Sequence, residues 1–279
     1  MLKIPVIGVL TLLRTDLLIR LINSIDYPVE NLIILFQGKN LEEEAEKENI
    51  ELEQFIQNKF IEKYTFIYCN MNIGVSRGWN YILRNYMKEY CLISGDDNYF
   101  ENGTLQKIAE YMNIDSLDNV FIGLNIKRKD NTIVPAGFNS YIITHKIHEK
   151  VGLFDENIYP AYFEDDDLWK RIVISGEKTI TIPNTYIFSG DDNYTESCTL
   201  NSVTLEYRDK MHQCYLRNEI YFYSKWGNNK EYLFPFNDSE NIDIKTQLYH
   251  ENYHENQEIL LGHKNEPDFS VAIHFFSQI

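Results

Sequence analysis

Short apolar runs alternate with amphipathic segments along the first hundred residues of this 279-residue chain, and that alternation limits the possible folds most. The runs at 4–12, 31–36, 64–69 and 91–94 have the length of buried strands, and segments with helical spacing of apolar residues lie between them. Strands and helices that alternate at this spacing predict an α/β fold with three layers and a mostly parallel central sheet. Such sheets bind ligands at the carboxyl ends of their strands.

Polar side chains stand where each of these predicted strands ends. They are Thr11 and Arg14, Gln37, Asn72, and the pair Asp96 and Asp97. Because parallel strands end at the same edge of a sheet, we expect these side chains to lie close together and to contact a ligand.

Two acidic clusters are the strongest chemical signal. Asp96–Asp97 follows the fourth predicted strand, and Glu164–Asp167 opens a predicted helix. Carboxylates held close together repel one another, so the fold must offset them with a divalent cation, a helix N-terminus or a bound proton. A cation with an anionic phosphate ligand suits the first cluster, and a general base at a helix start suits the second. The alternatives are an acidic turn without metal and acids that only cap a helix.

One six-residue string occurs twice. Ser-Gly-Asp-Asp-Asn-Tyr stands at 94–99 and again at 189–194, each time after an apolar segment. The flanking sequences differ, which argues against a duplicated domain. Either the repeat is a coincidence of loop composition, or both loops face the same bound metal and diphosphate.

Four motifs in order give the chain a specific resemblance. They are Asn-x-Gly-x-x-x-Gly-x-Asn at 72–80, the acidic pair at 96–97, Val-Gly-Leu-Phe-Asp-Glu at 151–156, and Tyr-Phe-Glu-Asp-Asp-Asp-Leu at 162–168 followed by Arg171. Together they resemble the family-2 glycosyltransferases of the GT-A fold. The resemblance covers roughly residues 4–236 and is strongest over 151–171.

The resemblance implies an inverting enzyme that takes a sugar from a nucleotide-sugar donor, UDP- or dTDP-linked, to a hydroxyl of a saccharide or glycoconjugate. It implies Asp165 as the catalytic base, with Glu164 beside it, and Mn²⁺ or Mg²⁺ held by Asp97 and Asp96. Many relatives place a third metal ligand, a histidine, after a late strand. This chain has no histidine there, and the candidate substitutes are Asp191, which we name as a metal ligand, and Asp192. The implied donor-binding residues are Thr11, Arg14, Gln37, Asn72, Gly74, Arg77, Asn80 and Asp96.

The same resemblance divides the chain into three parts. Residues 1–100 form the nucleotide-sugar-binding half and residues 101–198 the acceptor and catalytic half of one GT-A domain, followed by a C-terminal helical extension and tail at 199–279. We expect Asp167 and Arg171, four residues apart on a helix, to pair as structural supports. Homo-oligomerisation through the tail is left open.

Net charge and composition exclude several classes of partner. The net charge of -16 argues against nucleic acid and against an anionic membrane surface as the main anchor. No apolar run is long enough to span a membrane, and the four cysteines form no Cys-x-x-Cys pair, which predicts buried thiols in a reducing compartment. We therefore expect a cytoplasmic protein, with peripheral membrane attachment left open.

Three other functions are alternatives to glycosyl transfer. A sugar-phosphate nucleotidyltransferase would carry a Gly-rich basic loop after the first strand, and residues 12–15 are not Gly-rich. A non-catalytic carbohydrate-binding protein on the same fold would not need both acidic clusters. The string His-Glu-Asn-Tyr-His at 250–254 matches a zinc-protease pattern, but its polar surroundings favour a solvated tail.

Overall fold

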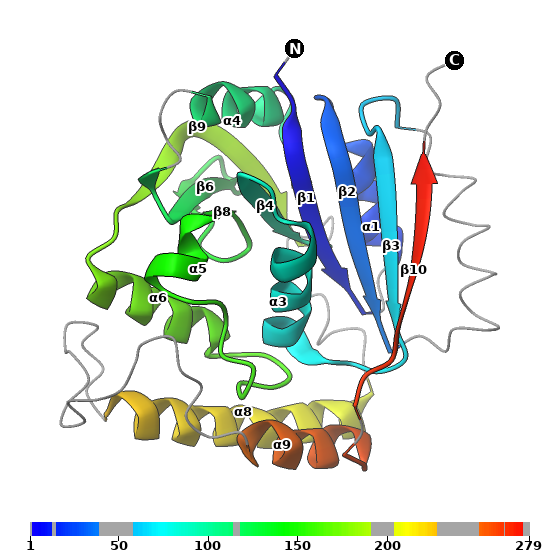
Figure 1. Cartoon of the computed structure of the whole chain (residues 1–279), viewed down its shortest axis with the longest axis vertical. Helices are drawn as coiled ribbons and strands as arrows, with labels where there is room; N and C mark the ends of the chain where they lie inside the picture. Colours follow the sequence, from blue (N-terminus) through cyan, green and yellow to red (C-terminus); the bar gives the residue numbers. More distant parts are fainter. Residues whose placement is uncertain are drawn as a thin grey trace.

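The computed structural model describes residues 2–12, 15–38, 58–113, 118–190, 204–227, 251–264 and 266–275 (Figure 1). The strands are β1 (Ile4–Thr11), β2 (Val29–Gln37), β3 (Lys63–Cys69), β4 (Tyr90–Gly95), β5 (Asn98–Phe100), β6 (Phe121–Lys127), β7 (Ile133–Pro135), β8 (Ser140–Thr144), β9 (Thr179–Ser189) and β10 (Phe269–Phe275). The described helices are α1 (Thr15–Asn23), α3 (Gly74–Tyr86), α4 (Thr104–Met112), α5 (Lys146–Lys150), α6 (Glu164–Ser175), α8 (Leu205–Trp226) and α9 (Glu251–Leu261).

The described strands form one sheet in the order β10-β3-β2-β1-β4-β8-β6-β9-β5, with β7 paired to β6. Its centre is parallel, because β1 pairs in parallel with β2 and β4, and β2 pairs in parallel with β3. Thr11 lies beside Phe36, and Gln37 beside Cys69, so these strands end together at one edge. The predicted α/β class with a mostly parallel central sheet is confirmed.

Helices cover both faces of the sheet and give it two cores (Figure 1). Side chains along β2 alternate between the cores: Leu32 and Ile34 face α1 and α4, whereas Ile33 and Leu35 face α3, α5 and α6. Strands that are apolar on both faces require such a three-layer arrangement, because burial of both faces supplies most of the stabilising free energy.

Two glycines let α3 approach β1 closely. A Cβ atom on Gly78 would lie 2.9 Å from Leu10 Cδ1, and one on Gly8 would lie 3.0 Å from Ile82 Cγ2. The second glycine of the 72–80 motif therefore serves helix-to-sheet packing.

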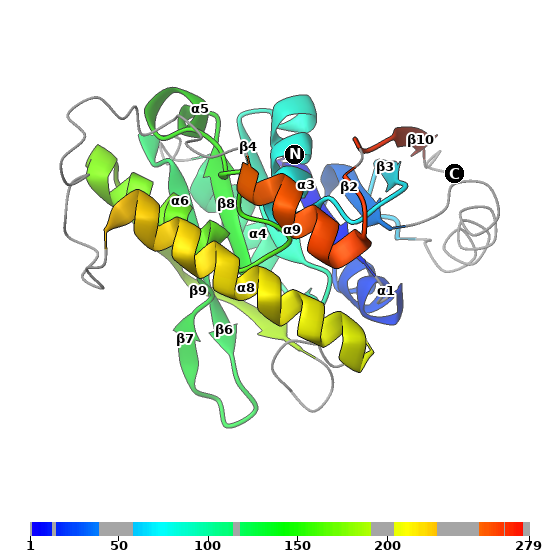
Figure 2. The same cartoon turned by 90° about the horizontal axis from the view of Figure 1, so that it is seen from below.

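The end of the chain returns to the sheet. Helices α8 and α9 lie side by side across the edge at which β1, β2 and β3 end, and β10 then pairs antiparallel with β3 (Figures 1 and 2). The interpretation of residues near 250–254 as a solvated tail is wrong for the described part, because Tyr253, Asn256 and Gln257 on α9 are buried. Helix α9 buries amide side chains at positions where most packed helices bury apolar ones, so its sequence lacks the apolar pattern that predicts a packed helix. His250 lies outside the described residues.

Buried ion pairs fasten α8 to α6. Lys225 Nζ lies 2.7 Å from Asp155 Oδ2 and 2.6 Å from Asp167 Oδ1. Arg171 Nε lies 2.9 Å from Asp167 Oδ2, which confirms the expected pairing, and Trp226 Nε1 donates a hydrogen bond to Asp167 Oδ1. Two cations thus balance two anions in a cluster almost closed to water.

No described helix has the length and hydropathy needed to cross a membrane.

Replacing Lys225 tests how far this cluster stabilises the fold. Lys225→Met would leave two carboxylates buried with one cation, and the free energy of unfolding should fall by about 3–5 kcal/mol in urea denaturation at neutral pH. Lys210→Met is the matched control, because Lys210 pairs with Glu206 at the surface and should change stability by less than about 1 kcal/mol. Equal small losses in both variants would show that the cluster contributes little.

Candidate active site

A cavity of about 300 Å³, the strand-end cavity, opens at the carboxyl ends of the parallel strands. Its walls come from the ends of β1 and β2, the segment after β3, the loop after β4, the segment before α6, and α8. The lining residues are Leu10, Thr11, Leu12, Gln37, Asn72, Val75, Trp79, Gly95, Asp96, Asp97, Phe138, Asn139, Pro160, Ala161, Tyr162, Glu164, Tyr207 and Met211.

Six of the residues singled out from the sequence line this cavity: Thr11, Gln37, Asn72, Asp96, Asp97 and Glu164. The two acidic clusters are far apart in the chain, yet the first contributes two carboxylates to this cavity and the second contributes one. Arg14 and Asp191 lie outside the described residues. Gly74, Arg77, Asn80 and Asp165 are not among the residues that line it.

The structure gives Gly74, Arg77 and Asn80 contacts within the protein. Asn80 Nδ2 donates to Phe154 O at 2.8 Å, and Asn80 Oδ1 accepts from Phe154 N at 2.9 Å. Arg77 donates to Tyr253 Oη at 2.9 Å on α9. A Cβ atom on Gly74, whose φ is +80°, would lie 2.8 Å from Tyr159 Cδ2. These three residues tie the start of α3 to the 154–160 segment and to α9.

The N-terminus of α3 is already supplied with acceptors. Ile73 N donates to Gln37 Oε1, Gly74 N to Asn72 Oδ1, and Val75 N to Pro160 O. The N-terminus of a helix can offer free amide groups to a ligand. These three are instead hydrogen-bonded within the protein, and Gln37 and Asn72 each link the cavity wall to the helix start.

The loop after β4 folds its carboxylate over a glycine. A Cβ atom on Gly95 would lie 2.9 Å from Asp97 Oδ1, so only glycine leaves room for this position of the carboxylate. Asp96 and Asp97 offer the hard oxygen ligands that Mg²⁺ and Mn²⁺ bind. No group of three or more His, Cys, Asp or Glu side chains suited to a metal occurs in the part of the chain that the structure describes. Two carboxylates are fewer ligands than a hard cation takes, so a cation at this loop would need further oxygen ligands from a bound molecule or from water.

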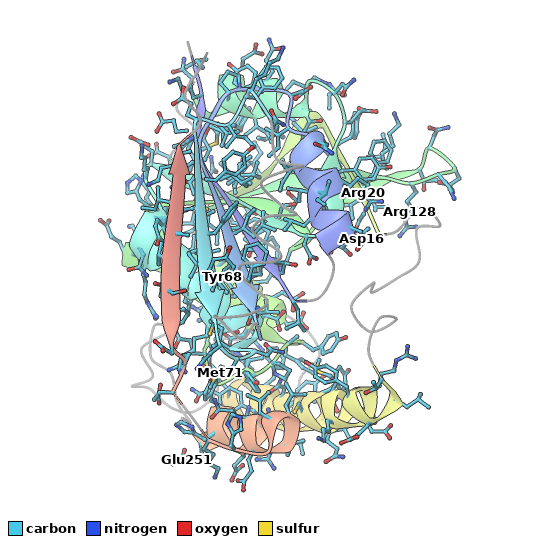
Figure 3. The ribbon with its side chains drawn as sticks, turned by 90° about the vertical axis from the view of Figure 1, so that its right-hand side faces the viewer. Asp16, Arg20, Tyr68, Met71, Arg128 and Glu251 are labelled. Carbon is cyan, nitrogen blue, oxygen red and sulfur yellow. The ribbon has the colours of Figure 1, made fainter. Side chains whose placement is uncertain are left out.

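Arg20 joins the two copies of the repeated string. From α1 (Figure 3), its Nη2 donates to Asp97 O at 2.8 Å and also to Gly190 O. Gly190 N donates to Asp97 O at 3.2 Å, and Asn98 pairs with Ser189 where β5 meets β9. The first copy therefore lies beside the start of the second, whose acidic pair is outside the described residues. No motif pointed to Arg20, since only tertiary structure brings it here.

The acidic run at the start of α6 separates into three environments. Glu164 lines the cavity described above, and Asp167 lies in the buried ion-pair cluster. Asp165 and Asp166 line a second cavity, of about 310 Å³, which shares Phe138 with the first. The proposed base and the acidic loop thus lie at neighbouring cavities.

Burial and neighbouring charge set the protonation of this run. Burial, together with the Asp165 charge, raises the pKa of Glu164 to about 8. Burial and the adjacent Asp166 also raise the pKa of Asp165 above its ordinary value. Burial alone would raise the pKa of Asp167, but Lys225 and Arg171 outweigh it and hold that pKa low. Glu164 Oε2 and Tyr141 Oη are buried without a hydrogen-bond partner among the described residues.

A turn with unusual backbone geometry presents Glu164. Tyr162 and Phe163, just before α6, have φ of 74° and 75°, a left-handed conformation that costs roughly 1–3 kcal/mol for each residue. Asn218 of α8 supports the turn by donating to Ala161 O at 3.0 Å and to Tyr162 O at 3.4 Å. Helix α8 therefore stabilises the segment that places Glu164 in the cavity.

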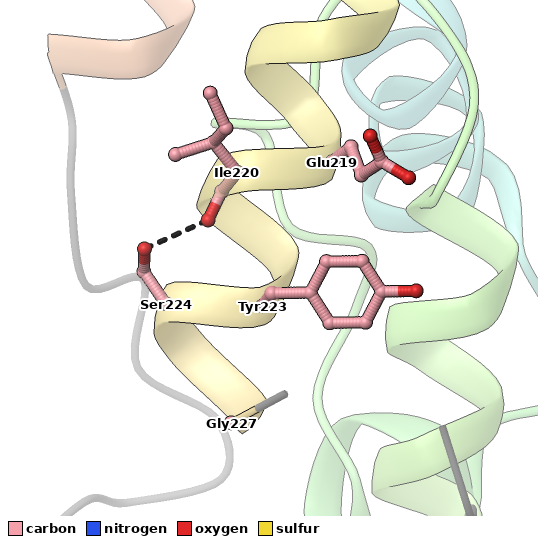
Figure 4. A pocket seen from close by; sticks show the side chains of 5 residues that line it. All are labelled: Glu219, Ile220, Tyr223, Ser224 and Gly227. Carbon is pink, nitrogen blue, oxygen red and sulfur yellow. Dashed lines mark hydrogen bonds between the residues drawn. The ribbon is translucent and has the colours of Figure 1, made fainter. Parts of the chain in front are cut away.

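A larger hollow of about 610 Å³ lies elsewhere, along α8 (Figure 4). Its lining comes from that helix and the glycine after it, with Glu219 as its one carboxylate among Ile220, Tyr223, Ser224 and Gly227. It collects none of the acidic residues considered above, so the strand-end cavity is the better candidate site.

No protein-family model and no curated protein matches the chain, but solved structures share its fold. GalNAc-T7 with UDP, GalNAc and Mn²⁺ matches with a TM-score of 0.57 and 9% identity, over 83% of this chain and 49% of that one. S. aureus TarS 1-349 with UDP-GlcNAc matches with a TM-score of 0.55 and 12% identity, over 92% and 70%. The mannosyltransferase PcManGT from Pyrobaculum calidifontis, with GDP-Man and Mn²⁺, has a TM-score of 0.50 and 14% identity, over 77% and 63%.

The chain has the GT-A fold. This confirms the fold expected from the motifs, while membership of family 2 stays a prediction. The chain spans about half the length of GalNAc-T7 and under two thirds of PcManGT. In this GT-A domain the strand-end cavity is the candidate active site.

The raised pKa of Glu164 predicts a pH-dependent stability. The folded state holds a proton on Glu164 between the ordinary pKa of 4.5 and about 8, whereas the unfolded chain releases it. Wild-type melting temperature should therefore fall relative to that of Glu164→Gln as pH rises from about 5 to about 8, and the difference should then level off.

Glu110→Gln, an exposed glutamate on α4, is the control and should track the wild type at each pH. A melting-temperature difference for Glu164→Gln that stays constant with pH would contradict the buried, protonated state of Glu164.

Proposed function

We propose that this GT-A protein is an inverting glycosyltransferase that moves a sugar from a nucleotide-sugar donor to a hydroxyl of a saccharide acceptor. One observation carries the proposal: Asp97 and Glu164, from two distant acidic clusters, line a single cavity at the carboxyl ends of the parallel strands. The structural neighbours support it, because GalNAc-T7 was solved with UDP, GalNAc and Mn²⁺ and PcManGT with GDP-Man and Mn²⁺.

The donor lies in the strand-end cavity in this proposal. Thr11, Gln37 and Asn72 on its wall offer hydroxyl and amide groups to the nucleoside of a UDP- or dTDP-linked sugar. Asp97 and Asp96 would hold Mn²⁺ or Mg²⁺, and the cation would supply Lewis-acid stabilisation of the negative charge on the leaving diphosphate. Arg20 fixes the backbone of this loop through Asp97 O.

The transfer step forms a bond from the acceptor oxygen to the anomeric carbon and breaks the bond from that carbon to the diphosphate. Asp165 takes the proton that the acceptor hydroxyl loses. Glu164 is the weaker candidate for this role, because with a pKa of about 8 it is largely protonated at neutral pH. In the neutral form it can donate a hydrogen bond within the donor cavity.

Asp97→Asn tests the role of the metal. Calorimetry would measure UDP, dTDP and GDP binding with and without Mn²⁺, and the nucleotide that binds best to the wild type would be followed. Loss of the Asp97 carboxylate should weaken nucleotide binding in the presence of Mn²⁺ by about tenfold or more. The affinity for the nucleotide without metal should be nearly unchanged. Asp118→Asn, an exposed acid paired with Lys146, is the control. Wild-type affinity that is indifferent to a chelator would refute a metal at Asp97.

Asp165→Asn tests the catalytic base. The substitution keeps the shape of the side chain and removes the proton acceptor, so kcat should fall by about a hundred- to ten-thousand-fold while donor affinity is nearly unchanged. Sugar transfer to a panel of saccharide acceptors would be measured, with Glu164→Gln in parallel. Full turnover by Asp165→Asn, or a larger loss of kcat in Glu164→Gln, would move the role to another group.

A further inference from the structure

The second cavity has a fixed aromatic wall. Phe121, Phe138 and Trp169 line it, and the ring centroids of Phe121 lie 5.0 Å from Phe138 and 5.7 Å from Trp169. Tyr141, fully buried, stacks on Phe121 at 5.2 Å. Rings packed against one another in this way are held in place, and their apolar faces suit the C–H faces of a sugar ring.

The polar side chains that line this cavity are two carboxylates and one hydroxyl. Asp165 and Asp166 come from the first turn of α6, and Thr181 comes from β9. Carboxylates accept hydrogen bonds from hydroxyl groups, so they can bind a sugar that carries no charge. The described residues that line the cavity include no Lys, Arg or His, and an anionic group placed here would meet two carboxylates without a lining cation.

The position of the cavity connects it to the donor site. Phe138 belongs to both cavities, and Glu164 and Asp165 are adjacent residues at the start of α6 that line one cavity each. A ligand in the second cavity therefore lies beside Asp165, the group assigned as base, and next to the cavity assigned to the donor.

We propose that the second cavity binds the acceptor as an uncharged pyranose stacked on the Trp169 and Phe138 wall, and that Asp166 excludes acceptors with a phosphate or carboxylate on that ring. The assignment of this sugar as the acceptor rests on the proposed function. The acceptor hydroxyl gives its proton to Asp165 as its oxygen bonds to the anomeric carbon, and the diphosphate leaves with the bonding electron pair.

Binding without donor tests the cavity apart from catalysis. Saturation-transfer NMR would measure affinities for a set of methyl pyranosides and for their 6-phosphates. The best neutral ligand should bind about tenfold more tightly than its phosphate. Trp169→Leu should weaken neutral binding by about tenfold, while Trp169→Phe keeps a ring and should retain most of it. Melting curves would show that each variant is folded.

Asp166→Asn tests the selection by charge. This substitution should reduce the ratio of the affinity for a neutral pyranoside to the affinity for its phosphate by about fivefold, because one of the two repelling carboxylate charges is removed. The exposed Asp118→Asn is the matched control and should leave this ratio unchanged. The proposal would be overturned if the wild type bound the sugar phosphates as tightly as the neutral pyranosides. It would also be overturned if Trp169→Leu were folded and bound the neutral pyranosides with unchanged affinity.

Donor turnover separates this proposal from the proposed function. Trp169→Leu should lose transfer to the acceptor through a higher KM, while hydrolysis of the nucleotide sugar by water persists. If no nucleotide sugar binds but pyranosides bind in a Trp169-dependent way, the sugar site stands and glycosyl transfer fails. If nucleotide sugars bind and turn over while pyranosides bind independently of Trp169, glycosyl transfer stands and the assignment of this cavity fails.

Discussion

The buried ion pairs of Lys225 set the relation between α6 and α8, and the candidate site depends on that relation. Lys225 reaches Asp155 and Asp167 at once, and Arg171 completes a cluster with no net charge. A buried charge without its partner costs several kcal/mol, so both helices are held to one arrangement. With α8 in place, Asn218 supports the left-handed turn before α6. Helix α8, which also lines the strand-end cavity through Tyr207 and Met211, is therefore part of the candidate site.

The same cluster explains why four consecutive acids can do different things. Asp167 is neutralised by cations and serves the fold, whereas Glu164, Asp165 and Asp166 remain near one another at a helix N-terminus. Burial and mutual repulsion raise the pKa values of Glu164 and Asp165, and partial positive charge at the helix start opposes that rise. Glu164, whose pKa is raised to about 8, can exchange a proton near neutral pH, which suits acid–base work where the two cavities meet.

The sequence predicted the fold where local pattern and topology agree. Apolar runs with helices between them imply a parallel sheet, and the strand-end rule led to Thr11 and Gln37, which the structure places in one cavity. The contacts of Asn80 could not be predicted from the sequence. A polar residue in a motif gives the same sequence pattern whether its side chain faces a ligand or forms hydrogen bonds with the backbone of Phe154. Helix α9 was missed because hydrogen-bonded amides such as Asn256 fill positions where apolar residues would reveal packing.

The central claim is that the acidic loop and the start of α6 enclose a nucleotide sugar and its metal. Anomalous diffraction from a crystal grown with Mn²⁺ and the best-binding nucleotide would test it most directly. We predict one strong manganese peak beside Asp97 and density for the nucleotide in the strand-end cavity, which Glu164 also lines. A peak at another site, or a nucleotide bound outside the strand-end cavity, would contradict the claim.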